Sequence, residues 1–241
     1  MTEGLRELQL YLRDTGRFEG LIAANVDPCD GIYGNATRTA IMRAFDDGPD
    51  TALADGDYAA SSRILAVPAA YIKAFASVEA NGSGFFHGEP KILFEPHRFS
   101  KLTNHRFDAS HPHVSYPRWG MRPYPGTQEG RYEQLLEAIG LDPRAAFKAC
   151  SYGKFQILGE NAAACGFPGE PWLFAFAQAR DEIQQLRAFE KFINSTGIVI
   201  PLRGALWAQV AARYNGPAYA KNQYDVKLAQ AAHRFMQEAQ T

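Results

Sequence analysis

The stretch FASVEANGSGFF, residues 75–86, places one acidic residue, Glu79, at the end of an apolar run with helical spacing. A Gly/Ser/Asn breaker follows it, and phenylalanines stand at both ends of the stretch. A carboxyl group at the C-terminal end of a helix faces the negative end of the helix dipole, and apolar neighbours remove its hydrating water. Both effects raise the pKa of Glu79, so that it can stay protonated near neutral pH and act as a general acid. A glutamate that ends a helix and points into solvent is the alternative that this stretch alone leaves open.

Two later fragments combine aromatic and polar residues with a turn. SYGKFQIL, residues 151–158, places a glycine before a predicted helix that carries Gln156. ARYNGP, residues 212–217, ends another predicted helix with Tyr214 and Asn215. Each fragment is a weak signal by itself, because aromatic residues of a core and a residue that caps a helix give the same pattern.

The composition indicates a soluble globular protein. The 241 residues are 46% apolar with a formal net charge of −1, enough for one domain of ordinary size and a small one. The near-neutral charge argues against a nucleic-acid-binding protein. No run approaches 18 apolar residues, so no transmembrane segment is expected. The start, MTEGLRELQLYLRD, lacks the basic and apolar regions of a secretory signal peptide.

Three cysteines, Cys29, Cys150 and Cys165, have an odd count and no CxxC spacing. Neither a disulfide framework nor a zinc site of the CxxC type is therefore expected. We expect all three to be reduced core residues, with a Cys150–Cys165 bridge or a reactive Cys150 as the alternatives.

The chain divides into a small module, a linker and a larger domain. Residues 1–48 contain a leucine-lined helix capped by Thr2 and a second helix capped by Asn35. Residues 49–65 are rich in Asp, Gly and Ala and are predicted to be a linker that becomes helical towards its end. Residues 66–241 form the larger domain.

The larger domain is predicted to be mainly helical. Its first helix begins at Pro68, and residues 85–99 contain a small β-hairpin that includes the run Ile92–Phe94. Residues 100–130 are predicted to be a loop. Further helices are predicted at 129–139, 143–149, 155–165, 171–195, 202–214 and 225–239, the last of them capped by Asp225. The predicted fold class is thus mainly α, in an α+β arrangement with one hairpin.

The first 48 residues resemble the three-helix peptidoglycan-binding domain of cell-wall hydrolases. The shared features are a Leu-Gln helix, a DGIYG turn at Asp30–Gly34 and a Thr-x-x-Ala helix. The loop before the turn, residues 17–29, is longer than in most members, which leaves the shape of the binding groove open. The resemblance implies that this module binds peptidoglycan.

Glu79, SYGKFQI and ARYNGP occur in the order found in the lysozyme-like superfamily, which includes goose-type lysozymes and lytic transglycosylases. Together with VEANGSGF and KILFEPHRF they resemble more closely the N-acetylmuramidase domain of phage endolysins, over residues 70–236. The resemblance implies a lysozyme-like fold in which Glu79 is the general acid.

The resemblance also implies the other site residues. Glu95, in the predicted hairpin, would position or activate water, unless it is a structural partner of His97 or Arg98, and Asp108 is a weaker candidate for the same role. The residues implied to line the substrate cleft are Tyr152, Gln156, Tyr214 and Asn215.

The function implied is that of a bacteriolytic endolysin, a monomer without cofactor or metal that cuts the β-1,4 bond between N-acetylmuramic acid and N-acetylglucosamine in bacterial peptidoglycan. Without a signal peptide, it would wait in the host bacterial cytoplasm and reach the periplasm with the help of a holin.

Three other functions remain open. A lytic transglycosylase would use the same acid and leave 1,6-anhydro ends. A zinc-dependent peptidoglycan peptidase would use the histidines between His97 and His113, although these residues lack the HExxH spacing of a zinc site. A non-catalytic wall-adhesion protein would have no need for a desolvated acid such as Glu79.

Overall fold

The computed structural model describes residues 3–22, 26–80 and 82–240. Its α-helices are α1 (Glu3–Asp14), α2 (Asn35–Phe45), α3 (Asp55–Leu65), α4 (Ala69–Ala80), α5 (Pro96–Leu102), α6 (Gln128–Leu141), α7 (Pro143–Lys148), α8 (Pro171–Ala177), α9 (Glu182–Ser195), α10 (Val199–Arg203), α11 (Trp207–Asn215) and α12 (Tyr224–Glu238). Short 3-10 helices, η1 (Gly159–Cys165) and η2 (Pro217–Asn222), complete the helical structure. The prediction of a mainly α fold is confirmed. No helix in the described ranges is long and apolar enough to cross a membrane.

The strands form two small antiparallel sheets. In the first, β1 (Phe85–Phe86) pairs with β2 (Glu89–Pro90), which is a hairpin within the predicted segment. In the second, β3 (Ile92–Phe94) pairs with β4 (Cys150–Tyr152), which also pairs with β5 (Ile157–Leu158). The predicted hairpin therefore ends before Ile92.

The prediction of a helix over residues 155–165 is wrong in its first part. Residues 157–158 form β5, and only residues 159–165 are helical, as η1. A short apolar run such as FQIL fits a buried strand as well as a helix, and residues 157–158 pair with β4.

Several predicted helix boundaries are also wrong. The long helix at 171–195 is two helices, because the side chain of Asp181 accepts a hydrogen bond from the Gln184 amide and begins α9. The helix at 202–214 is likewise divided between α10 and α11. Asn35 and Asp225 do not cap their helices, because each lies inside the first turn. The capping positions are occupied by Gly34 in α2 and by Gln223 in α12. Thr2 lies outside the described residues.

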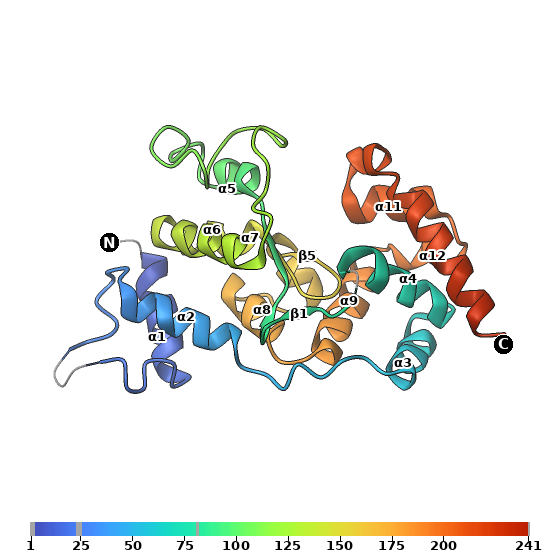
Figure 1. Ribbon diagram of the computed structural model, residues 1–241, viewed down its shortest axis with the longest axis horizontal. Coiled ribbons are helices and arrows are strands. Elements are labelled where there is room, and N and C mark those ends of the chain that lie inside the picture. Colours follow the sequence, from blue (N-terminus) through green and yellow to red (C-terminus); the bar gives the residue numbers. More distant parts are fainter. Residues whose placement is uncertain (1–2, 23–25, 81, 241) are drawn as a thin grey trace.

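The N-terminal module packs against the larger domain. The Phe45 side chain is fully buried and its ring lies 5.0–6.3 Å from the rings of Tyr132, Phe147, Tyr152 and Phe176. Figure 1 shows α1 and α2 against α6–α8 at one end of the long axis, with α3, α11 and α12 at the other. Both parts of the chain therefore share one hydrophobic core.

The segment predicted as a linker is held along its length. A side chain at Gly48 would collide with the carbonyl oxygens of Ala179 and Arg180, so the backbone there lies directly on the start of α9. The Thr51 carbonyl accepts a hydrogen bond from the backbone amide of Glu182. Beyond it, α3 is an ordered helix with Tyr58, Ser61 and Leu65 buried.

A buried ion pair ties this segment to the loop that follows α4. Glu182 is fully buried, and its Oε2 atom lies 2.8 Å from Lys154 Nζ and accepts a hydrogen bond from Leu53 N. Its Oε1 atom accepts a hydrogen bond of 2.6 Å from Gly84 N. Lys154 Nζ also donates to Gly82 O. These contacts fix the chain directly after α4, the helix that ends with Glu79.

Two glycines allow this close approach. Gln185 Oε1 accepts a hydrogen bond of 2.6 Å from Lys154 N. A Cβ atom would come within 2.5 Å of the Gln185 amide group at either Gly84 or Gly153, and Gly153 also has a positive φ of 69°. The glycine of the SYGKFQI motif, Gly153, is thus required by the packing of Gln185.

We predict that Glu182→Gln lowers the free energy of unfolding by about 3 kcal/mol, because it leaves the buried Lys154 ammonium without its counter-charge. Urea denaturation followed by circular dichroism measures the change. The matched control is Glu133→Gln, since the Glu133–Arg38 pair is exposed and should cost less than about 1 kcal/mol. Equal losses in the two variants would contradict the proposed importance of the buried pair.

Candidate active site

Glu79 lies in the last turn of α4, beside a tyrosine from α12. The Tyr224 hydroxyl donates a hydrogen bond to Glu79 Oε1. Burial raises the pKa of Glu79 to about 7, although the hydrogen bond from Tyr224 acts in the opposite direction. A carboxyl group with this pKa is protonated in an appreciable fraction of molecules at neutral pH, which is what a general acid needs.

Tyr224 connects Glu79 to the end of α11. It accepts a hydrogen bond from the Asn215 side chain, and its ring stacks on that of Tyr214 with centroids 6.3 Å apart. Tyr214 in turn packs against Phe75 of α4 and donates a hydrogen bond of 2.6 Å to Phe155 O. The ARYNGP fragment therefore holds the acid in place through Tyr224, a residue that the sequence analysis missed.

A cavity of about 320 Å³ opens beside this group. Its walls come from α5, β4, β5, η1, α9 and α11, and its lining residues are Glu95, Arg98, Ser151, Gln156, Ile157, Leu158, Glu160, Asn161, Phe192, Thr196, Arg213, Tyr214, Asn215 and Gly216. The structure thus brings together Glu95, Gln156, Tyr214 and Asn215. Glu79 is not part of the lining, and it is linked to the cavity through Tyr224.

Glu95 occupies the position before α5, on the cavity wall. Its Oε2 atom lies 3.3 Å from His97 Nε2 and 3.5 Å from Arg98 Nε, which makes these ion pairs loose. Burial raises the pKa of Glu95, the charge of Arg98 lowers it, and the nearby Glu160 raises it again. Glu95 therefore both faces the cavity and has the two partners considered in the sequence analysis.

Glu160, at the start of η1, is a second carboxylate in the cavity that sequence analysis missed. Its Oε2 atom accepts a hydrogen bond of 2.7 Å from Arg98 Nη1. Arg98 thus lies between Glu95 and Glu160 and contacts both carboxylates. No sequence signal marked Glu160, because η1 was predicted as part of a longer α-helix.

Two predicted cleft residues have other positions or roles. Tyr152 is 1% exposed and its hydroxyl donates a hydrogen bond to Phe147 O, so the prediction that Tyr152 lines the cleft is contradicted by its burial in the core. Gln156 lines the cavity, but its Nε2 atom donates to the carbonyl oxygens of Lys91 and Gly153. The Gln156 amide therefore also holds the turn between β4 and β5.

Asp108 belongs to a separate polar group in the loop after α5. It accepts hydrogen bonds from Ser100, Ser115 and His105. Burial raises the pKa of Asp108, but these hydrogen bonds outweigh it and the pKa lies below its ordinary value. Asp108 is absent from the cavity lining and has the contacts of a structural residue.

The four histidines between residues 97 and 113 point to different partners. His97, His105 and His113 contact Glu95, Asp108 and Glu137 respectively, and His111 contacts Ser110. Within the described ranges, no three His, Cys, Asp or Glu side chains are grouped so that they could hold a metal ion. Cys29, Cys150 and Cys165 are buried and free, and burial raises the pKa of the Cys165 thiol to about 12.

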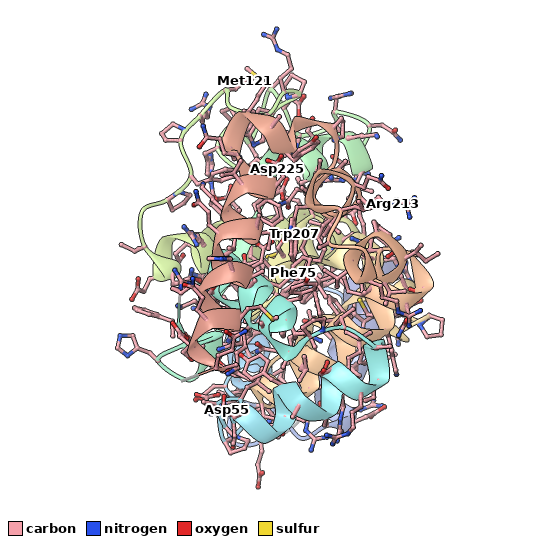
Figure 2. The ribbon with its side chains drawn as sticks, turned by 90° about the vertical axis from the view of Figure 1, so that its right-hand side faces the viewer. Asp55, Phe75, Met121, Trp207, Arg213 and Asp225 are labelled. Atoms are coloured by element: carbon pink, nitrogen blue, oxygen red, sulfur yellow. The ribbon has the colours of Figure 1, made fainter. Side chains whose placement is uncertain are left out.

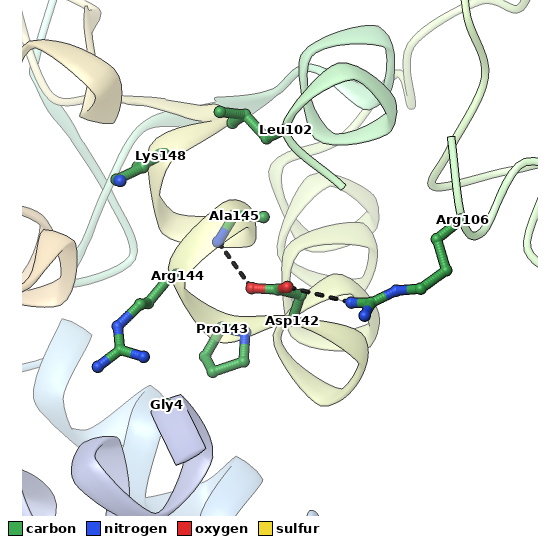
Figure 3. A pocket seen from close by; sticks show the side chains of 8 residues that line it. All are labelled: Gly4, Leu102, Arg106, Asp142, Pro143, Arg144, Ala145 and Lys148. Atoms are coloured by element: carbon green, nitrogen blue, oxygen red, sulfur yellow. Dashed lines mark hydrogen bonds and ion pairs between the residues drawn. The ribbon is translucent and has the colours of Figure 1, made fainter. Parts of the chain in front are cut away.

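A second pocket, of about 370 Å³, lies where α1 approaches α5 and α7 (Figure 3). Its carboxylate, Asp142, accepts a hydrogen bond from Ala145 N and pairs with Arg106. Arg144 is occupied by Glu7 and Glu170. Because its acidic group is fully engaged, this pocket offers no group that could serve as a general acid.

Comparisons with known proteins agree with this site. The model of the N-acetylmuramidase family matches residues 68–236. The crystal structure of a Burkholderia AP3 phage endolysin is similar to the whole chain, with 32% sequence identity and a TM-score of 0.68, over 99% of this chain and 96% of that one. A comparison with curated proteins gave no match.

The family match covers Glu79, the cavity and α12, and it extends over most of the chain. The chain therefore belongs to the N-acetylmuramidase family, and it is a glycoside hydrolase that acts on peptidoglycan.

Proposed function

We propose that the chain hydrolyses the β-1,4 bond between N-acetylmuramic acid and N-acetylglucosamine, with Glu79 as the general acid. The observation that carries this proposal is the pKa of Glu79, raised to about 7 by burial next to the cavity. Cleavage of a glycosidic bond requires a proton for the leaving oxygen, and a carboxyl group that is still protonated at neutral pH supplies it.

We assign the second step, delivery of water to the anomeric carbon, to Glu95. Its loose contacts with His97 and Arg98 leave carboxylate oxygens able to bind a water molecule at the cavity wall. Burial raises the pKa of Glu95 above its ordinary value, and the positive charge of Arg98 opposes this rise and so favours the ionised form that a general base needs. Glu160 would keep Arg98 in position through their hydrogen bond.

We also infer that the chain is a phage endolysin, like the solved structure it resembles over its full length. It would act as a monomer, remain in the host bacterial cytoplasm until lysis, and reach the peptidoglycan with the help of a holin. Tyr214, Asn215 and Gln156 would bind the sugars, since they line the cavity.

We predict that Glu79→Gln reduces lysis of outer-membrane-stripped cells by about 10²–10⁴-fold, because it removes the transferable proton and keeps the shape. At pH 8 the free energy of unfolding of Glu79→Gln should be at least that of the wild type, because the variant has no ionised carboxylate at position 79. The matched control is Glu190→Gln. Burial also raises the pKa of Glu190, which is not in the cavity lining, so this variant should keep its activity.

Mass spectrometry of the wild-type products identifies the bond. Reducing N-acetylmuramic acid ends, which borohydride reduces, are expected. Products with 1,6-anhydro ends would favour the transglycosylase, and cleaved peptide stems with intact sugar chains would favour the peptidase. Full activity in Glu79→Gln would refute the assignment of the acid.

We predict that Tyr224→Phe moves the alkaline limit of kcat/KM to higher pH. Activity requires protonated Glu79, so it should fall as the pH rises through about 7 in the wild type. The hydrogen bond from Tyr224 stabilises the ionised carboxylate, and its removal therefore raises the pKa. A pH–rate profile measures the shift, and a limit that moves to lower pH would contradict this role of Tyr224.

We propose that residues 1–48 bind peptidoglycan through the surface around the Asp30–Gly34 turn. The buried Gln9 holds this turn, with its Oε1 atom accepting from Gly31 N and its Nε2 atom donating to Ile32 O and Thr37 Oγ1. Ile32, which lies within this turn, is 65% exposed. An apolar side chain fixed in this way is suited to contact a polymer.

We predict that Ile32→Asp weakens sedimentation with purified sacculi about fivefold in the Glu79→Gln background, where the sacculi stay intact. A substitution is preferable to deletion of the module, because deletion would expose the core around Phe45. Ile200→Asp, at an equally exposed position on α10, is the control and should bind normally. Equal binding by both variants would refute the wall-binding surface.

A further inference from the structure

The loop between α5 and α6 exposes a tryptophan that the proposed mechanism does not use. Trp119 is 55% exposed and Met121 is 48% exposed, in the stretch YPRWGMRPYP over residues 116–125. Figure 2 shows Met121 at the outer edge of the molecule, while Phe75, next to the acid, lies deep inside it. Large apolar side chains exposed together on a soluble protein commonly mark a binding surface.

Both ends of this loop are fixed to the fold. On the α5 side, Ser115 is buried and its hydroxyl donates a hydrogen bond of 2.6 Å to Asp108. On the α6 side, Arg131 donates to Pro125 O and to Ile92 O at the start of β3. Three prolines within residues 116–125 restrict the backbone further. Trp119 is therefore held in place before any ligand arrives, which lowers the entropy cost of binding.

Trp119 is also connected to the catalytic cavity. Its indole N–H donates a hydrogen bond to Tyr124, and burial raises the pKa of Tyr124, with a smaller contribution from the charge of Glu95. Tyr116, buried at the other side of the loop, is likewise within the electrostatic reach of Glu95. The loop that carries the exposed indole thus approaches Glu95, a residue of the cavity wall, through Tyr116 and Tyr124.

The chemistry of the loop fits a glycan strand. An indole ring presents a large, rigid apolar face with a single polar N–H, which suits the apolar face of a sugar ring. Arg118 and Arg122 flank it, and within the described residues neither forms an ion pair with a carboxylate. Peptide stems of peptidoglycan carry carboxylates beside the sugars, and guanidinium groups bind carboxylates well.

We propose that Trp119 is a stacking platform for a sugar ring of the glycan strand outside the catalytic cavity, so that it favours long strands over short fragments. This inference rests on the proposed function, because it assumes that the cavity binds the same strand. Trp119 would contribute to substrate binding without taking part in bond cleavage.

The kinetic test compares Trp119→Ala with Met121→Ala, which alters the same loop at a similarly exposed position. Trp119→Ala should lower kcat/KM on purified long glycan strands about tenfold through KM, as expected for loss of about 1.4 kcal/mol of binding. Short soluble fragments should be cleaved at the wild-type rate, and Trp119→Tyr should restore part of the loss. An equal effect of both alanine variants, or an equal loss on long and short substrates, would overturn the proposal.

A binding test separates this inference from the proposed function. In the Glu79→Gln background, purified glycan strands should protect the protein's tryptophan fluorescence from iodide quenching, and the protection should disappear in Trp119→Phe. Of the three tryptophans, Trp172 is buried and Trp207 is partly buried, so Trp119 is the most accessible to iodide, and its replacement by phenylalanine identifies its share of the signal. If wild-type products prove to be anhydro sugars, the proposed bond chemistry fails while protection remains. If glycan strands give no protection while hydrolysis is normal, the stacking platform is overturned and the proposed function stands. Protection by phosphatidylglycerol vesicles but not by glycan strands would also overturn the platform, because it would assign the loop to a membrane surface.

Discussion

The buried ion pair between Glu182 and Lys154 is the contact on which the geometry of the site depends. Glu182 joins three segments that are far apart in sequence, because it binds the backbone at Leu53, the backbone at Gly84 and the Lys154 ammonium. A buried carboxylate is tolerated only when such partners replace its water. The arrangement therefore specifies where the loop after α4 can lie. It also explains why the segment before α3 cannot act as a flexible tether.

The acid itself weakens the fold. The folded-state pKa of Glu79 is about 7 against an ordinary value of 4.5, so the folded protein binds more protons than the unfolded chain between these values. Stability consequently falls as the pH rises through this window, by about 3 kcal/mol in total. The aromatic packing of Phe75, Tyr214 and Tyr224 around the acid offsets this cost. Function and stability therefore oppose each other at one residue.

Sequence patterns predicted the parts of the site that depend on local structure. Glu79 could be placed because helical periodicity and a following breaker are both local signals. Tyr224, Glu160 and Glu182 could not, because their roles arise from contacts with distant residues. The helix predicted where β5 forms has a different cause, because β5 pairs with the neighbouring β4 and its short apolar run fits a strand as well as a helix. Composition also suggested a linker at residues 49–65, whereas packing at Gly48 and along α3 holds the segment in place.

The assignment of Glu79 as the general acid depends on burial keeping a large fraction of this carboxyl group protonated near neutral pH. Carbon-13 NMR of protein labelled at the glutamate carboxyl group measures this directly, with the Glu79 resonance assigned by its loss in Glu79→Gln. A titration midpoint close to 7 is the result expected from the burial of this side chain. A midpoint close to the ordinary 4.5 would mean that Glu79 is ionised at neutral pH, and it would contradict the assignment of this residue as the general acid.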